Sequence, residues 1–256
     1  MTDVLVCIKR VPDVGGSVEL TDDEQGVDTR HLGFTTSPHE EAAVELAVQV
    51  AQATGGTATV LTVGDEDAVE QLRDALALGC TAATRVEADL ASYGPADVAA
   101  AIADVVRSHE AEGRAHDLVL LGNDAADTGD FQVGIRLAYG LGRPVVTGAQ
   151  MVTVEGDRVV ARVEGSEGVE TYELPTPAVV TVMEGGVEPR YPSIPGRMKA
   201  KRVQVETIED SRTPVGSGRV RLTLPPEAPS QVEVLGKGPE AAPAVVDLLE
   251  KLGVLR

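Results

Sequence analysis

Residues 117–134 read Asp-Leu-Val-Leu-Leu-Gly-Asn-Asp-Ala-Ala-Asp-Thr-Gly-Asp-Phe-Gln-Val-Gly. The apolar run 118–121 predicts a buried strand, an acid-rich loop follows, and Phe131, Ile135 and Ala138 then recur at helical spacing. In an open α/β sheet, ligands bind outside the carboxyl ends of the strands, where the N–H groups at a helix start favour an anion. This strand–loop–helix unit therefore predicts an α/β fold with a crevice suited to phosphate.

The segments before this unit alternate between strand and helix patterns. The clearest helix start is Ser37-Pro38-His39-Glu40, in which Ser37 and Glu40 have the spacing of a capping box and Pro38 takes the first helical position. Such alternation predicts right-handed crossovers and an open, mostly parallel, Rossmann-like sheet. The predicted strands are 3–8, 57–63 and 83–86, and the predicted helices are 37–54, 65–79 and 95–110.

The pattern changes after residue 144. Three strand-like runs separated by Gly- and acid-rich turns predict an added β-meander, and another buried strand follows it. We predict a nucleotide-binding α/β domain with the meander over residues 1–205, and a C-terminal arm with little core of its own over 206–256. The meander runs are 145–154, 158–163 and 169–174, the next strand is 177–182, and a short terminal helix is expected at 243–252.

The composition limits the class of partner. The formal net charge is −19, from 22 basic and 41 acidic side chains, and its field would repel nucleic acids and anionic membrane surfaces. Aromatic residues make up only 2%, so Val, Ala and Leu must fill the core, as in a buried parallel sheet. We therefore expect no nucleic-acid partner.

Cys7 and Cys80 lie far apart without a C-x-x-C motif, which predicts two buried small hydrophobes and no metal site. No apolar run reaches membrane-spanning length, and Met1 leads directly into a strand-like segment without a signal-peptide pattern. These features predict a cytoplasmic protein without membrane insertion.

Catalytic and classical nucleotide fingerprints are missing from the sequence. Neither G-x-G-x-x-G after the first strand, nor G-x-x-x-x-G-K-[ST], G-x-S-x-G or H-E-x-x-H occurs. We therefore predict no catalytic residues, and we interpret the scattered histidines as surface or cap residues. These are His31, His39, His109 and His116.

Three segments are predicted to meet at the carboxyl edge of the sheet. The loop within 117–134 has more carboxylates than a turn requires, and we interpret them as acceptors for ribose hydroxyls or as helix N-caps. The helix start at 37–40 would open on the same edge, although a capping box needs no ligand. Lys9 and Arg10 would add positive charge, although such a pair is commonly solvated.

Four basic side chains lie within six residues of this otherwise acidic chain: Arg197, Lys199, Lys201 and Arg202. They fit a charged edge strand that resists aggregation. They fit a docking contact to an acidic partner or a phosphate equally well.

Several motifs, in the same order, resemble the β subunit of electron transfer flavoprotein, from residue 3 to about 205. Singly they are weak, but as a set they are specific. They are the Val-Leu-Val-Cys-Ile-Lys-Arg-Val-Pro-Asp run at 4–13, Ser37-Pro38 with 41–45, the 118–122 run followed by Asp127, Gln132 and Gly134, Pro-Ala-Val-Val-Thr at 177–181, and 188–193 through 198–201.

The resemblance implies an adenine nucleotide α hydrolase-like fold and a heterodimer. An α subunit would hold most of a redox-active FAD, while this chain would bury an AMP with a structural role. The pair would carry electrons from acyl-CoA or other flavin dehydrogenases to a membrane quinone oxidoreductase, as in fatty acid β-oxidation, without being an enzyme. The 206–256 arm would embrace the α subunit and become ordered on binding.

Carried over by position, the AMP site falls on the strand ends and helix starts identified above. The predicted cofactor-binding residues, with Lys9 added for its charge, are Cys7, Lys9, Ser37, Pro38, His39, Glu40, Val63, Asn123, Asp124, Ala125, Asp127, Thr128, Gly129, Asp130, Phe131, Gln132, Val133 and Gly134. The segment that resembles the dehydrogenase-docking loop contains Gly185, Gly186, Val187, Glu188, Pro189, Arg190 and Tyr191.

The chain departs from the family at two informative places. Gly185-Gly186 stands where the family presents a leucine anchor, and Val14 stands where many members have an aromatic residue near the flavin. Two alternatives remain open. One is a flavin-bifurcating relative with a second FAD in place of AMP and NADH as donor, and the other is a stand-alone adenine-nucleotide-binding enzyme.

Overall fold

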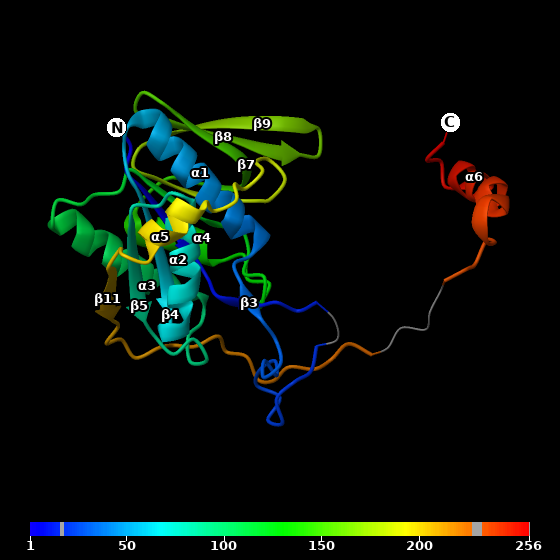
Figure 1. Ribbon diagram of the computed structural model, residues 1–256, viewed down its shortest axis with the longest axis horizontal. Coiled ribbons are helices and arrows are strands. Elements are labelled where there is room, and N and C mark those ends of the chain that lie inside the picture. Colours follow the sequence, from blue (N-terminus) through cyan, green and yellow to red (C-terminus); the bar gives the residue numbers. More distant parts are fainter. Residues whose placement is uncertain (16–17, 227–231, 256) are drawn as a thin grey trace. The chain divides into compact units, whose positions relative to one another are not determined.

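The computed structural model describes residues 1–15, 18–226 and 232–255 (Figure 1). The chain divides into two compact units, the first ending at Leu222 and the second beginning at Thr223. Each unit is described by itself.

Within the described residues, nine strands of the first unit form one sheet in the order β11-β5-β4-β1-β6-β10-β7-β8-β9. Neighbours from β11 to β7 pair in parallel, and β7, β8 and β9 pair antiparallel. This confirms the predicted mostly parallel α/β sheet with an added meander. The strands are β1 Val4–Ile8, β4 Ala58–Gly64, β5 Ala82–Glu87, β6 Leu118–Gly122, β7 Val145–Glu155, β8 Arg158–Gly165, β9 Gly168–Pro175, β10 Ala178–Val182 and β11 Val205–Glu209. The short strands β2 Val11–Pro12 and β3 Phe34–Thr35 form a separate pair.

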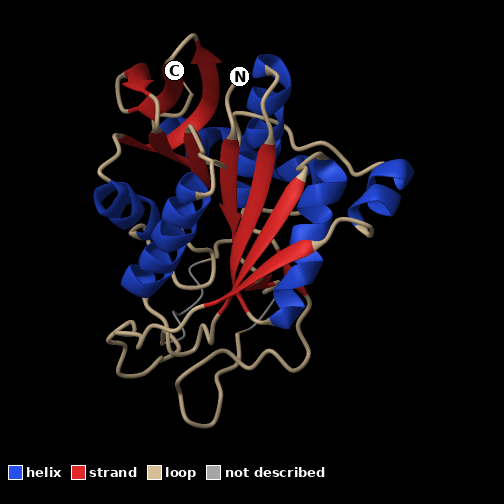
Figure 2. Ribbon diagram, turned by 90° about the vertical axis from the view of Figure 1, so that its left-hand side faces the viewer, coloured by secondary structure: helices blue, strands red, loops and turns tan. Residues whose placement is uncertain are grey.

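Helices cover both faces of the parallel part of the sheet (Figure 2). Because successive side chains of a strand point to opposite faces, Val4, Val6 and Ile8 belong to one apolar cluster and Leu5 and Cys7 to the other. The first cluster includes α1 and α2, and the second includes α3 and α4. The helices are α1 Pro38–Thr54, η1 Glu66–Ala68, α2 Val69–Leu78, α3 Pro95–Ala111, α4 Val133–Leu141, α5 Ile194–Ala200, η2 Gly238–Ala241 and α6 Ala242–Lys251.

The core is filled by small and medium aliphatic side chains, and Leu46 at the centre of α1 is fully buried. We expect Leu46→Ala to lower the free energy of unfolding by about 2–5 kcal/mol, because it removes apolar contacts and leaves a cavity. Urea denaturation followed by circular dichroism measures the loss. Leu224→Ala, at a side chain that is 55% exposed, is the control. A loss at Leu46 no larger than at Leu224 would contradict the assignment of this core.

The first part of the predicted arm, from residue 206, packs on the main sheet and so does not belong to a separate arm. Strand β11 pairs with β5 at the edge of the main sheet. Beyond it, Arg212 forms an ion pair with Asp104 of α3, and the backbone N–H groups of Val215 and Gly216 donate to Asp97. Residues 206–222 are therefore part of the first unit. The second unit contains η2 and the amphipathic helix α6; Val245, Val246 and Leu248 of α6 and its C-cap residue Leu252 are exposed in this chain.

One local prediction was wrong, and one of two open interpretations is excluded. Helix α4 begins at Val133, so Phe131 lies in the preceding loop with 58% of its surface exposed instead of on a buried helical stripe. The basic cluster is not an edge strand. Arg197 and Lys199 lie in α5, and Lys201 and Arg202 follow in its terminal turn, because Ser193 caps this helix and Pro195 lies in its first turn.

His109 and His116 are buried, which corrects their interpretation as surface or cap residues. The two rings share a hydrogen bond of 3.0 Å between Nδ1 of His109 and Nε2 of His116, beneath Glu206 of β11. Burial lowers the pKa of both rings, that of His116 to about 4, so the pair is neutral at neutral pH. It joins α3 to the edge strand as part of the fold.

Cys7 and Cys80 are free thiols inside the core, as predicted. Burial raises the pKa of Cys80 to about 12 and also raises that of Cys7, so neither is a thiolate at neutral pH. Over the residues that the structure describes, no helix is long and apolar enough to cross a bilayer. The same residues contain no group of three or more His, Cys, Asp or Glu side chains arranged to hold a metal ion.

Candidate functional site

The carboxyl ends of three neighbouring strands lie level with one another. Cys7 of β1 is opposite Leu61 of β4 on one side and Leu121 of β6 on the other. Val63, the penultimate residue of β4, is buried. The backbone at Cys7, the segment at Lys9 and the loop after β6 therefore open on one edge, as expected for parallel strands.

Helix α1 begins at this edge with the predicted capping box. The Ser37 hydroxyl accepts from the Glu40 N–H at 3.3 Å, while the Glu40 carboxyl accepts from the N–H and the hydroxyl of Ser37 at 3.1 and 2.8 Å. Pro38 and His39 form the turn between them. Glu40 is buried, and burial raises its pKa to about 7, against the opposing effects of the Ser37 hydrogen bonds and Lys9.

This pKa gives Glu40 a pH-dependent effect on stability. The folded-state pKa is raised above its unfolded value, so the favourable contribution of the neutral group is present below pH 4.5 and is lost as the pH rises through 7. Relative to Glu40→Gln, we expect the wild type to lose up to about 3 kcal/mol of unfolding free energy between pH 4.5 and 8. Urea unfolding across this range measures the difference, and parallel curves would contradict it.

The α1 start and the end of β6 are in direct contact. A Cβ added at Gly122 would lie 2.9 Å from Cγ of Glu40 and 3.4 Å from Cβ of His39. Only glycine lets the strand end approach the helix start this closely. The two loops predicted to open on a common edge are therefore brought together.

The loop between β6 and α4 is held at both ends. Next to β6, the N–H of Asn123 donates to Val182, and its side-chain oxygen accepts from the Thr181 hydroxyl at 2.6 Å. Within the loop, the N–H of Ala125 donates to the carbonyl of Asp130, and the Ala125 carbonyl accepts from the N–H groups of Thr128 and Gly129. Gly129 has a φ of 66°. The loop is thus a defined turn at the end of the sheet.

Two of the loop carboxylates face basic side chains from other segments. Lys9, after β1, lies 2.8 Å from Asp127, and Nδ1 of His39 lies 2.5 Å from Oδ1 of Asp124. The Lys9 ammonium offsets negative charge of Asp127 that would repel a phosphate. Of the two interpretations of the loop acids, caps of α4 are excluded, because Gln132 is the N-cap residue and no side chain makes a cap hydrogen bond there.

Helix α4 begins in close contact with β10. A Cβ added at Gly134 would lie 2.3 Å from Cγ2 of Thr181, so the helix start is packed against the strand end. The first N–H groups of an α-helix have no carbonyl partner within the helix and can face an anion. Val133 and Gly134 supply such groups beside the loop, so the site combines a helix dipole, a close backbone approach and a Lys9 cation. This donor set fits a phosphate, and the loop acids fit sugar hydroxyls.

Thr181 was missed by the sequence analysis. Its hydroxyl donates to Asn123 and accepts from the N–H of Gly148, and so links β10, β7 and the loop. A polar residue in the otherwise buried run of β10 was the available signal, because Thr181 is next to the carboxyl end of that strand.

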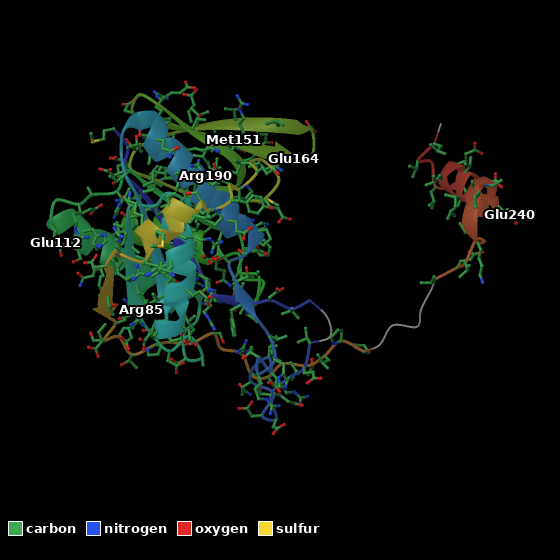
Figure 3. All side chains as sticks on the ribbon, viewed as in Figure 1. Arg85, Glu112, Met151, Glu164, Arg190 and Glu240 are labelled. Carbon is green, nitrogen blue, oxygen red and sulfur yellow. The ribbon has the colours of Figure 1, made fainter. Side chains whose placement is uncertain are left out.

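The predicted docking segment, residues 185–191, lies between β10 and α5. Arg190 is not a free basic contact, since its guanidinium forms an ion pair with Glu45 of α1 at 2.7 Å (Figure 3). Gly186 is pressed against the carbonyl of Gln150, whereas Tyr191 is 94% exposed. Arg190 and Gly186 therefore hold the segment against α1 and β7, and Tyr191 is exposed beside them.

Comparison with known proteins identifies relatives over most of the chain. Residues 26–213 match the family model described as the electron transfer flavoprotein domain. The chain is 37% identical to electron transfer flavoprotein subunit beta of Bacillus subtilis over 175 residues, which are 68% of this chain and 66% of that protein. It is 34% identical to that of Mycobacterium tuberculosis over 233 residues (87% and 84%), and 36% identical to that of Homo sapiens over 210 residues (80% of each).

Proposed function

The chain belongs to the β subunits of the electron transfer flavoprotein family, and on this premise we propose that it is an electron-carrier subunit that binds AMP. It works with an α subunit, as the name of its relatives implies, and forms one side of an FAD site that the α subunit mainly holds. The observation that supports AMP binding is the convergence of two helix starts and a charge-paired loop at one edge of the sheet.

Each part of the proposed AMP site has a separate task. The N–H groups of Val133 and Gly134 and the Lys9 ammonium receive the phosphate. We assign the ribose hydroxyls to the carboxylates of Asp124, Asp127 and Asp130, which all lie in the loop between β6 and α4. Ser37 and Glu40, the two buried residues of the 37–40 turn, exclude water from one side of the nucleotide.

We assign the protein no bond-breaking step of its own. The FAD, when bound at the interface with the α subunit, supplies the redox chemistry. The contribution of this chain is to shape and close that site and to dock the electron donors.

For docking we propose residues 185–191 as the contact with acyl-CoA or other flavin dehydrogenases. Tyr191 takes the exposed position, while Arg190 and Glu45 hold the base of the segment. The electrons then pass to a membrane quinone oxidoreductase, and we place the protein in the cytoplasm.

The test is a nucleotide count on the complex purified with its α partner. Denaturation followed by chromatography is expected to release one FAD and one AMP per heterodimer. Two FAD without AMP would establish the flavin-bifurcating alternative instead, and one FAD without any adenylate would refute the AMP site. Nucleotide turnover by the isolated chain would favour a stand-alone enzyme.

A further inference from the structure

A small polar cavity lies between α1, α2 and β3. Its volume is 120 Å³, and none of its lining residues belongs to the proposed AMP site. Ile8, Val44 and Ala75 give it an apolar floor, and all three are buried. Such a floor accommodates an alkyl chain.

Gln71 of α2 lines this cavity with an unused hydrogen-bond acceptor. The side chain is 3% exposed, and its Oε1 has no hydrogen-bond partner among the described residues. A buried amide oxygen without a donor is costly, and native proteins rarely retain one. The cavity therefore lacks a hydrogen-bond donor for Gln71, and a ligand with N–H groups can supply one.

Three carboxylates surround the same cavity: Glu41 of α1, and Glu70 and Asp74 of α2. Burial raises the pKa of Glu41 and of Asp74, and the nearby Glu70 raises that of Asp74 further, while Arg197 opposes this. The other neighbouring cation, Arg10, is stacked 3.3 Å over the Phe34 ring and lies 3.7 Å from Asp67. The carboxylates thus outnumber the cations that face them.

We propose that this cavity binds a guanidinium or ammonium group carried on an alkyl chain. A water could satisfy Gln71 alone, but it would not offset the three carboxylates or use the apolar floor. A donor-only cation answers all three features, because it can donate to Gln71, pair with the carboxylates and place its methylenes on Ile8, Val44 and Ala75. The cation comes from a free small molecule or from an Arg or Lys side chain of the bound subunit.

The experiment titrates n-butylguanidinium and its uncharged analogue n-butylurea against the full chain, alone and in complex with its α partner. The side-chain amide resonance of Gln71 reports binding at this cavity. In the chain alone, n-butylguanidinium is expected to bind at least about tenfold more tightly than n-butylurea, which corresponds to about 1.4 kcal/mol. Equal affinities, or no shift with either compound, would overturn the proposal.

The two arms separate the sources of the cation. A response retained in the complex shows that the cavity takes a free small molecule. A response present in the chain alone and lost in the complex shows that a side chain of the bound subunit fills the cavity. Either outcome supports a cation site.

Variants separate the cavity from general charge attraction. Asp74→Asn and Glu41→Gln should weaken n-butylguanidinium binding severalfold, whereas Glu167→Gln, in the exposed turn between β8 and β9, should leave it unchanged. Gln71→Leu, measured by isothermal titration calorimetry because the reporting amide is gone, should weaken binding of both compounds, and it should raise the melting temperature because it removes an unpartnered amide. A lowered melting temperature would show that the amide already has partners, and would count against the site.

Discussion

Gly134→Ala is expected to reduce the AMP released from the purified complex from one per heterodimer to less than a tenth of that. The added Cβ would lie 2.3 Å from Cγ2 of Thr181, which is too close for a real contact. Rotating the Thr181 side chain away would break the hydrogen bonds of its hydroxyl with Asn123 and Gly148. Helix α4 must move away from β10, which displaces the N–H groups proposed to hold the phosphate. The strain itself should cost about 1–3 kcal/mol of stability.

Two further variants make this test specific. Thr181→Ser removes Cγ2 and keeps the hydroxyl that bonds Asn123 and Gly148, so the double variant Gly134→Ala/Thr181→Ser should recover AMP. Gly140→Ala adds a Cβ to the same helix where nothing lies within 4 Å, and it should retain AMP with slightly higher stability. Full AMP content in Gly134→Ala, or no recovery in the double variant, would contradict the role of this contact.

Removing residues 223–256 is expected to abolish association with the α subunit while leaving the α/β unit folded. This segment forms its own small unit, and α6 with its C-cap residue leaves four large apolar side chains exposed. Such a face is expected to be covered by a partner. Size-exclusion chromatography with light scattering measures assembly, and circular dichroism measures the fold of the remaining chain.

The position of the cut matters. Removing residues from 206 onward also deletes β11 and the contacts of Arg212, Val215 and Gly216 with α3, so we expect that longer truncation to destabilise the sheet. Leu252→Asp, at the C-cap of α6, should weaken association, whereas Glu250→Gln within the helix should not. Assembly that is unchanged after removal of residues 223–256 would show that these residues do not contact the α subunit.

Local sequence signals predicted most of the fold. The capping box at Ser37 and Glu40 fixed the start of α1, and the apolar runs 4–8, 118–122 and 178–182 marked the strands buried on both faces. These signals depend on hydrogen bonds and burial patterns within a few residues. The start of α4 was misplaced because Phe131, an apolar residue at helical spacing, belongs to the loop.

Contacts between distant segments were beyond such signals. His109 and His116 were interpreted as surface or cap residues; their burial was not predicted, because it depends on the distant edge strand β11, whose Glu206 lies 3.4 Å from His109. The ion pair of Arg190, within the predicted docking segment, was likewise not foreseen, because its partner Glu45 is 145 positions away in the chain. Pairing of this kind has no local pattern.

The sequence alone determined the α/β class, the β-meander and the segments that meet at the carboxyl edge, because periodicity and parallel pairing specify which ends open together. Only the tertiary structure decided what the acids of 117–134 do. Asp127 pairs with Lys9 and Asp124 lies against His39, so two carboxylates of the loop are engaged by basic side chains from two other segments. The structure also showed that Gly122 and Gly134 permit the close packing that brings these segments together, since that contact arises only when strand ends and helix starts approach each other in space.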